Sequence, residues 1–374
     1  MKISLFIAGD VVPKGIPAET FRKNGEQIFK DIKPHIKDSD FSIVNLEAPV
    51  ITGSPTPIMK YGPCLCTAPS TVEVRKDAGF GIISLANNHF YDQGQQGVEN
   101  TLSICKSLNM NTVGGGESLA ESRKPLILNK DGKQIAIINA CENEFSIANS
   151  YHGGSNPLDI INMQEDIAAV RKNVDYVISI LHGGVEQYQY PTPRMKKWYR
   201  HFVDLGVDAV INHHQHCMNG YEVYKGKPII YGLGNFYFPG GDKRPKSWQY
   251  GYAIRLNLAN HICFDLIPYR QTSDSIMIRD NFSFKKEIEL LNLPIADDYL
   301  LQQKFDEHLI DIENYLKSQL LPSFLKGKIF SKLSARGILG KLYYSHQIFN
   351  IKNKLTCESH YESLQRLFSI LTEQ

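Results

Sequence analysis

The stretch Ala209–His216 reads AVINHHQH, an apolar run followed by three histidines within four positions. Such a run is typical of a buried strand, so the histidines are predicted to stand at its carboxyl end. They are His213, His214 and His216, three of the 12 histidines in the chain. This density favours a metal site over a chance cluster on a loop, and the ends of the other strands test that hypothesis.

Four other predicted strands also end in polar residues. They span residues 3–8, 41–44, 81–86 and 176–181, and the groups that close them are Gly9-Asp10, Asn45-Leu46-Glu47, Asn87-Asn88-His89 and His182-Gly183-Gly184. In open α/β sheets the carboxyl ends of the strands line the ligand crevice. The five polar ends therefore predict one shared site.

Helical patterns alternate with these strands, which predicts an α/β sandwich. The predicted helices of this part span residues 19–36, 93–108, 158–172 and 194–205. An irregular loop is expected over 51–67 and a hairpin at Asp131-Gly132. The later strand-like runs, more antiparallel in character, span 221–224, 228–233, 252–258 and 262–268.

The composition changes near residue 275, and the remaining sequence is predicted to be mainly helical. The expected helices span about 296–320, 324–335 and 358–372. We therefore expect a main domain over residues 1–272 and a mainly helical C-terminal extension over residues 273–374. The length of 374 residues, above the ~100–200 of a typical domain, agrees with one large domain plus an appendage.

Composition limits the classes of function. Hydrophobic content of 42% and charged content of 21% suit a globular protein with a substantial core. The net charge of +2 gives no reason to expect a polyanion partner for the whole chain, and no nucleic-acid-binding motif occurs. Seven scattered cysteines without a Cys-x-x-Cys pair indicate a reducing compartment. The opening MKISLFIAGD has too short an apolar run for a signal peptide, so a cytoplasmic protein is expected.

The residue types at the strand ends suit a metal centre. His214 and His216, two positions apart, would point the same way if the backbone were extended. Imidazole, carboxylate and amide donors together bind manganese, iron, zinc or a similar divalent ion. Two such ions about 3.5–4 Å apart activate water and clamp an in-line displacement. Asp10 and Glu47 are the candidates for a bridging carboxylate, and His89 for a general acid.

Each of these residues also has a structural interpretation when it is considered alone. Asp10 would cap a turn, Asn87-Asn88 would form an Asx turn, and Glu47 would be a solvated loop carboxylate. His182 would be a satisfied histidine at a strand end. The metal hypothesis rests on all five groups falling at predicted strand ends.

The ordered set of motifs resembles the poly-γ-glutamate capsule biosynthesis family (CapA-type), a branch similar to the calcineurin-like metallophosphoesterases. The resemblance covers about residues 1–270, and its matching pieces are AGD at 8–10, NLEAP at 45–49, LANNHFYDQG at 85–94, LHGGVEQY at 181–188, NHHQH at 212–216 and YGLGNF at 231–236. It implies a sandwich of two mixed β-sheets flanked by helices, with a metal centre at the strand ends.

The resemblance also implies roles for individual residues. The implied metal ligands are Asp10, Glu47, Asn88, His182, His214 and His216. His89 takes the position of a histidine that contacts the leaving group, and Asp10 also belongs to the catalytic set. Asn87, Glu186, His213 and Asn235 are expected to contact substrate, although Glu186 as a solvated side chain and Asn235 as a turn residue are equally open. Asp92 is expected to cap the helix that follows it.

The sequence departs from the phosphoesterase pattern at three places, one of which is Glu47, where the wider superfamily usually has Asp. Asp10 is followed by Val11 and Val12 where Asp-x-His is usual, so either one or two ions are expected. Asn212 and Gln215 stand where the related motif has Gly and Pro, which puts the shape of that loop in question.

The expected function is a metal-dependent hydrolase that acts on a phosphoester or amide-like bond during synthesis or processing of a capsular polymer. An acidic or phosphorylated polymer, or its precursor, is the expected substrate. The alternative is a non-catalytic assembly component with the same fold. Segment 314–357 has eight Lys or Arg and no Asp or Glu. It is expected either to contact an anionic membrane surface or acidic polymer, or to pack on the main domain with its lysines in water.

Overall fold

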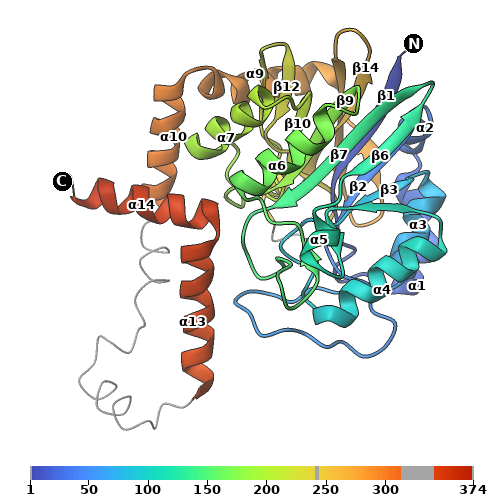
Figure 1. The fold of residues 1–374 in the computed structure, drawn as a ribbon, viewed down its shortest axis with the longest axis horizontal. Coiled ribbons are helices and arrows are strands. Elements are labelled where there is room, and N and C mark those ends of the chain that lie inside the picture. The colour runs from blue at the N-terminus through green and yellow to red at the C-terminus, as the bar shows by residue number, and fades with distance from the viewer. Residues whose placement is uncertain (1, 241–243, 313–340, 373–374) are drawn as a thin grey trace.

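The fold is known from a computed structural model that describes residues 2–240, 244–312 and 341–372 (Figure 1). Within these residues, the larger sheet has eight strands. Seven follow the order β16-β15-β14-β1-β2-β3-β4, and β13 pairs with β1. Their bounds are β1 Ile3–Val11, β2 Phe41–Leu46, β3 Ile82–Ser84, β4 Asn111–Val113, β13 Asn235–Tyr237, β14 Tyr250–Leu258, β15 Cys263–Gln271 and β16 Ile276–Ile278. The sheet is mixed, because β1 is parallel to β2 and antiparallel to β14.

The second sheet of the described chain has six strands in the order β11-β12-β10-β9-β7-β6. They are β6 Leu126–Lys130, β7 Lys133–Cys141, β9 Tyr176–His182, β10 Ala209–His213, β11 Tyr221–Tyr224 and β12 Lys227–Ile230. β7, β9, β10 and β12 are parallel to their neighbours in that order, whereas β6 and β11 are antiparallel edge strands. A small pair, β5 Gly115–Gly116 and β8 Gly154–Ser155, completes the strands.

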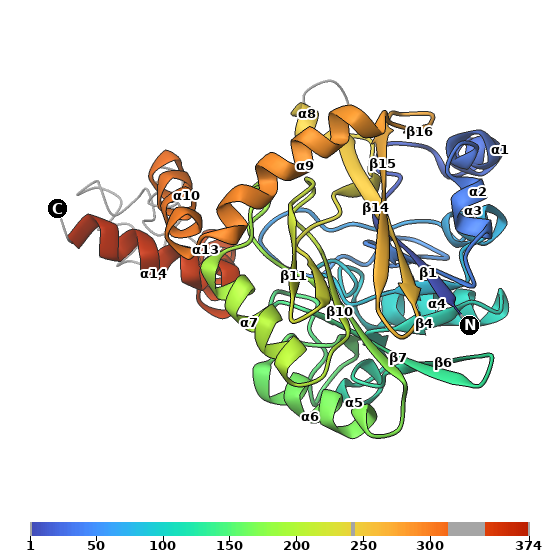
Figure 2. The ribbon, with the colours of Figure 1, turned by 90° about the horizontal axis from the view of Figure 1, so that it is seen from above.

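The two sheets face each other and helices cover their outer faces (Figure 2). The alternation of side chains along β1 explains the layers: Ile3, Leu5 and Ile7 join a core between the sheets, whereas Phe6 and Ala8 join the core on the helix side. Helices α1 Ala18–Phe29, α3 Ser70–Ala78 and α4 Gly94–Ser107 pack on the larger sheet, and α6 Ile160–Arg171 and α7 Pro193–Asp204 on the smaller one.

Two predicted helices differ from the structure. The single helix expected over 19–36 is wrong, because the chain forms α1 and then a separate α2, Lys33–Lys37, with Pro34 in its first turn. Proline lacks the backbone N–H that would continue a helix from the preceding turn, so it begins a new one. Helix α3 was not predicted, since its apolar spacing is weak. Short helices α5 Leu119–Ser122 and α8 Lys246–Gln249 lie in connections.

Four further helices follow the sheets: α9 Asn281–Ala296, α10 Asp298–Asp311, α13 Lys341–Thr356 and α14 Glu358–Thr372. The predicted helix at 358–372 is confirmed, whereas the one at 324–335 lies outside the described residues. α13 and α14 meet at a sharp corner, drawn in red in Figure 1, and α14 contacts α10. None of the described helices is both long and apolar enough to cross a membrane.

The expected sandwich of two mixed sheets flanked by helices, with a helical C-terminal region, is thus confirmed. The division at residue 272 stays a proposal; β16 continues the larger sheet beyond it by pairing with β15.

Candidate metal centre

The five polar strand ends meet in one place, at the carboxyl ends of strands from both sheets. β1, β2 and β3 of the larger sheet supply Asp10, Glu47 and Asn88. β9 of the smaller sheet supplies His182. β10 leads into the segment His213–His216, which we call the histidine loop. Because the sheets face each other, groups far apart in the sequence come within 4.8 Å of one another.

Glu47 lies at the middle of the cluster. Its Oε1 atom is 3.6 Å from Nε2 of His182 and 3.6 Å from Nε2 of His216. The residue is completely buried, and neither carboxylate oxygen has a hydrogen-bond partner in the described part of the chain. Burial, with the negative charge of Asp10 as a further cause, raises the pKa of Glu47 well above its usual value. A buried carboxylate without partners is costly unless a cation neutralises it, so this position fits a bridging metal ligand.

The first ligand group comprises Asp10, Glu47 and His216. Asp10 Oδ1 accepts a hydrogen bond from Asn45 Nδ2 at 2.7 Å, and Asp10 Oδ2 lies 3.6 Å from His216 Nδ1. His216 Nδ1 is also 2.9 Å from Asn235 Oδ1. If Nδ1–H donates to Asn235, then Nε2, which faces Glu47, keeps its lone pair for an ion.

The second ligand group comprises Glu47, His182 and His214, with Asn88 beside it. His182 Nε2 lies 3.1 Å from His214 Nδ1 and 3.1 Å from Asn88 Oδ1. Burial and then the three neighbouring histidines of the loop lower the pKa of His182 well below its ordinary value. A neutral imidazole is the form that coordinates a metal.

His213 extends the cluster on the side of Asp10. Its Nδ1 atom lies 3.9 Å from Asp10 Oδ1, and Asp10, His182 and His213 form a third group of possible ligands. Its Nε2 atom is buried and has no hydrogen-bond partner among the described residues. His213 thus places an imidazole near Asp10, where Val11 and Val12 do not supply one.

The side chains of His214 and His216 converge because the backbone turns between them. The sequence had suggested an extended backbone there. The backbone leaves the β conformation after His213, with φ of 91° at His214 and 56° at His216. Residues other than glycine rarely adopt these values, and such strain is concentrated at functional sites. The reasoning from an extended i, i+2 pair is therefore wrong, although the two rings do face the same centre, with centroids 6.1 Å apart.

Asn212 organises this loop in place of the glycine that the related motif carries. Its Oδ1 accepts a hydrogen bond from Tyr199 Oη at 2.7 Å. Its Nδ2 lies 2.9 Å from both Gly183 O and Gln215 Oε1. These contacts join β10, α7 and the loop after β9, so Asn212 is a structural anchor.

His89 is held by two buried charged residues. Its Nδ1 atom lies 2.6 Å from Asp92 Oδ2 and 3.2 Å from Lys60 Nζ, and Lys60 forms a salt bridge with Asp92. Burial first, and then the charge of Lys60, lower the pKa of His89. Asp92 does not cap α4, contrary to the prediction, because its carboxylate is used by this network. Gln93 stands at the N-cap instead, and its side chain makes no capping hydrogen bond.

The residues predicted to contact substrate occupy different positions. Asn87 and Asn235 are completely buried: Asn87 donates to Leu46 O at 2.9 Å, and Asn235 contacts His216. Their geometry is that of orienting residues. Glu186, in contrast, is an exposed residue. Although desolvation opposes the change, His216 and His214 lower the pKa of Glu186.

Three participants were assigned no individual role from the sequence. Asn45 links Asp10 to Asn87 by hydrogen bonds of 2.7 and 3.1 Å. Glu144 Oε1 lies 3.9 Å from His214 Nε2. Lys60 comes from the irregular 51–67 loop, where no pattern marks it. The only sequence signal was the place of Asn45 in the NLEAP motif.

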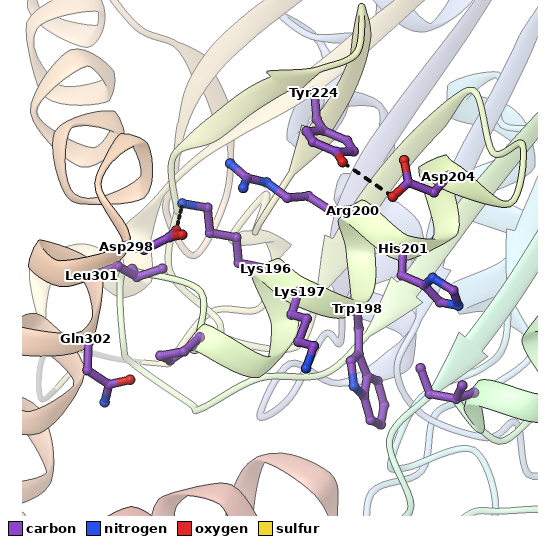
Figure 3. Close-up of a pocket in the computed structure, with 12 residues that line it drawn as sticks. Lys196, Lys197, Trp198, Arg200, His201, Asp204, Tyr224, Asp298, Leu301 and Gln302 are labelled. Carbon is purple, nitrogen blue, oxygen red and sulfur yellow. Dashed lines mark hydrogen bonds and ion pairs between the residues drawn. The ribbon is translucent and has the colours of Figure 1, made fainter.

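A groove of about 800 Å³ elsewhere on the molecule holds none of the predicted site residues (Figure 3). It lies between α7 and α10, and two of its cations are paired: Lys196 with Asp298, and Arg200 with Glu222 outside the groove. We therefore place the functional site at the strand ends and not in this groove.

The donors at the strand ends comprise carboxylate oxygens, imidazole nitrogens and an amide oxygen, a set that suits Mn²⁺, Fe²⁺ or Zn²⁺. The fold and this cluster together define an α/β sandwich protein with a candidate metal centre. Residues 4–240 match the family model described as "Bacterial capsule synthesis protein PGA_cap". The match covers more than half of the chain, which therefore belongs to this family, and the resemblance seen in the motifs is confirmed.

Two curated relatives carry related names. The chain is 31% identical over 255 residues to "Capsule biosynthesis protein CapA" of Bacillus anthracis, an alignment that covers 66% of this chain and 62% of that protein. It is 30% identical over 248 residues to "PGA biosynthesis protein CapA" of Bacillus subtilis (strain 168), with 65% of each covered. The chain thus spans slightly less than two thirds of the length of these relatives.

Solved structures give remote likenesses. A novel phosphatase from Mycoplasma pneumoniae aligns with a TM-score of 0.47 and 16% identity, covering 78% of this chain and 99% of that one. A putative 5'-nucleotidase from Staphylococcus aureus aligns with a TM-score of 0.45 and 12% identity, covering 82% and 58%. No activity is inferred from either likeness.

Proposed function

We propose that this chain is a metal-dependent hydrolase that cleaves a phosphoester or an amide-like bond during synthesis or processing of a capsular polymer. The observation that carries the proposal is Glu47, a buried carboxylate that has no hydrogen-bond partner among the described residues. Its Oε1 lies 3.6 Å from the Nε2 atoms of His182 and His216. A purely structural cluster would satisfy such a group with donors.

The proposed ligands form two sets that share Glu47. Asp10 and His216 complete the first set, and we propose that His213 adds the imidazole missing after Asp10. The second set is completed by Asn88, His182 and His214. When bound, divalent ions supply activation of a water molecule and stabilisation of the charge that develops on the substrate.

The chain's own residues would then orient the groups and move a proton. His89 Nδ1 is engaged by Asp92 and Lys60, which fixes the ring. The other ring nitrogen, Nε2, is the atom to which we assign proton transfer. We assign His89 the role of protonating the leaving group, a contribution worth about 10²–10⁴-fold in rate. Asn235 and Asn45 would hold His216 and Asp10 in place.

Membership of the capsule synthesis family supports the setting, and the names of the Bacillus relatives support a poly-γ-glutamate-like polymer. An acidic polymer or its phosphorylated precursor is therefore the proposed substrate. A peripheral membrane contact through 314–357 remains a proposal too. Residues 314–340 lie outside the described part; within α13, Lys352 is exposed and Lys354 is buried.

One experiment separates the proposed hydrolase from the alternative, a non-catalytic assembly component, because only the hydrolase should turn over a substrate. Protein reconstituted with Mn²⁺ is assayed with bis(p-nitrophenyl) phosphate, p-nitrophenyl phosphate and γ-glutamyl-p-nitroanilide. We expect turnover of at least one substrate, lost in His214→Ala and retained in His261→Ala, a change of an exposed histidine outside the cluster. A folded, metal-loaded protein that cleaves none of the three would favour the alternative.

A further inference from the structure

The segment Glu142–Ser146, which directly follows β7, lies beside the metal centre. The backbone N–H of its first residue donates to His182 O at 3.0 Å. The hydroxyl of its last residue accepts a hydrogen bond from the backbone N–H of Tyr91 at 3.0 Å. Between these two anchors, Glu144 approaches His214, with 3.9 Å between Oε1 of the glutamate and Nε2 of the histidine. One carboxylate of this segment is therefore directed toward a proposed metal ligand.

The two ring nitrogens of His214 face different groups. Nδ1 lies 3.1 Å from His182 Nε2, in the ligand group that includes Glu47, whereas Nε2 is on the side of Glu144. The side chains of His214 and Glu144 are only 3% and 11% exposed, so water screens their contact weakly. At 3.9 Å the two atoms are too far apart for a direct hydrogen bond, but a carboxylate at this distance favours the tautomer that carries its proton on Nε2. That tautomer leaves the lone pair of Nδ1 for a metal ion.

The helix α14 holds the same segment from another side, although it lies beyond the residues 4–240 that the family model matches. Glu358, at the start of α14, accepts hydrogen bonds from the side-chain amide of Asn143 and, at 2.8 Å, from its backbone N–H. Ser359 Oγ donates to Glu142 Oε1 at 2.8 Å. The two residues before Glu144 are thus fixed by the first turn of α14.

The helix α13 holds the residue after Glu144. Phe349 of α13 meets Phe145 edge to face, with ring centroids 6.2 Å apart. The C-terminal helices therefore contact the residues on both sides of Glu144, whereas the carboxylate of Glu144 itself is directed toward His214.

We propose that Glu144 is a positioning residue for His214, and that α13 and α14 hold Glu144 in that place. This inference rests on the metal-binding part of the proposed function. A carboxylate that orients a ligand histidine typically contributes about 10–100-fold to metal affinity. The C-terminal helices are then a support of the metal centre, and a change in their packing on the segment Glu142–Ser146 alters metal affinity without touching a ligand.

Glu144→Gln tests the first part of the proposal, because it removes the charge and keeps the size of the side chain. We expect the Kd for Mn²⁺, measured by calorimetry on the full chain, to rise about 10–100-fold, while the Tm of the metal-free protein stays unchanged. The visible absorption spectrum of the Co²⁺-loaded protein should change as well, because it reports the geometry of the ligands. Glu289→Gln at an exposed position is the control. An unchanged Kd or an unchanged spectrum in Glu144→Gln would overturn the proposal, and so would a lowered Tm without metal, which would make Glu144 a structural residue.

A double-mutant cycle tests the part played by the helices. Phe349→Ala removes the ring that packs on Phe145. It should weaken Mn²⁺ binding about threefold or more in the parent, but less than about twofold in the Glu144→Gln background, because the two changes act through the same side chain. If Phe349→Ala does not fold, Ser359→Ala, which removes the hydroxyl donor to Glu142, gives the same comparison.

Leu355→Ala, at a 58% exposed position of α13, is the control for this cycle and should bind Mn²⁺ as the parent does. Equal losses of affinity in both backgrounds would show that the helices act on the metal centre by another route. No loss in either background would show that they do not support it. Both results would overturn the part assigned to α13 and α14.

Turnover is measured on the same preparations, which separates this inference from the hydrolase proposal. A parent that binds Mn²⁺, with the expected losses in the variants but without cleavage of any substrate, would contradict the hydrolase proposal alone. A parent that turns over substrate, with an unchanged Kd in Glu144→Gln, would contradict the role of Glu144 alone. A parent that binds no Mn²⁺ would contradict both.

Discussion

Asn235 and His216 contact each other twice: His216 Nδ1 lies 2.9 Å from Asn235 Oδ1, and Asn235 Nδ2 donates to His216 O at 3.1 Å. The pair joins β13 to the histidine loop. Asn235 is also the register partner of Asp10 on β1. One asparagine therefore fixes both the ring and the backbone of a proposed ligand whose φ of 56° is unfavourable.

Replacing Asn235 by Ala should weaken metal binding. Loss of an orienting partner of a ligand histidine typically reduces metal affinity about 10–100-fold. The Kd for Mn²⁺ measured by calorimetry checks this, with Asn129→Ala, an exposed asparagine on β6, as the control. An unchanged Kd in Asn235→Ala would mean that His216 is not a ligand or needs no orientation.

Glu47→Gln should have opposite effects in the absence and presence of metal. Without metal, the change replaces a buried carboxyl group that has no hydrogen-bond partner in the described part of the chain, so we expect Tm to stay equal or rise. With Mn²⁺, the parent gains stability through binding and the variant does not. Thermal melts with and without Mn²⁺ measure both effects, and Glu19→Gln at an exposed position is the control. A metal-free Glu47→Gln protein that melts far below the parent would show that Glu47 is a structural residue.

Asp92→Asn should reduce turnover without changing metal content. Asp92 Oδ2 lies 2.6 Å from His89 Nδ1, and this contact fixes the ring whose other nitrogen is assigned to proton transfer. A general acid contributes about 10²–10⁴-fold to the rate. Because Asp92→Asn removes part of this contribution, kcat should fall about tenfold or more. Elemental analysis and kcat are measured together, with Asp77→Asn on the exposed side of α3 as the control. Normal kcat in Asp92→Asn would remove His89 from the mechanism.

The contact between α14 and the main domain should be pH-dependent. Burial, with the charge of Glu142 as a second cause, raises the pKa of Glu358 from 4.5 to about 7. Between these values the folded protein binds a proton at Glu358 that the unfolded chain does not, so stability falls as pH rises from about 5 to 7 and is level above 7.

Glu358→Gln removes this titration. Relative to the parent, the variant should gain about 1–2 kcal/mol in free energy of unfolding between pH 5 and 7, less than the full shift because the carboxylate is only partly buried. Urea unfolding at both pH values measures it, and Glu289→Gln at an exposed position should show no such difference. Equal pH slopes in Glu358→Gln and the parent would contradict the assignment.

The sequence allowed prediction of the sandwich and of the meeting of five strand ends, because both follow from local patterns. Apolar runs mark buried strands, and parallel strands in facing sheets bring their carboxyl ends together. The conformation of the histidine loop could not be predicted in this way. The positive φ values at His214 and His216 depend on anchors such as Asn212, whose partners Gly183 and Tyr231 are distant in sequence.

Contacts that depend on tertiary structure were missed for the same reason. Lys60, on an irregular loop, contacts His89. Asp92, which was expected to cap α4, forms a salt bridge with Lys60 instead. Lys354 belongs to a basic segment for which the sequence offered a solvated face or a membrane surface. Lys354 is buried because the corner between α13 and α14 packs on the segment after β7, more than 200 residues earlier in the sequence, and no local pattern indicates this contact.

The most direct test of the metal centre is the number of ions per chain, measured by elemental mass spectrometry on protein reconstituted with Mn²⁺, Fe²⁺ or Zn²⁺. The two ligand sets that share Glu47 predict about two ions in the parent, fewer in His213→Ala and His214→Ala, and the parent value in His261→Ala. One ion in the parent, unaffected by His213→Ala, would contradict the first set as we describe it. No ion under any of these conditions would contradict the account as a whole.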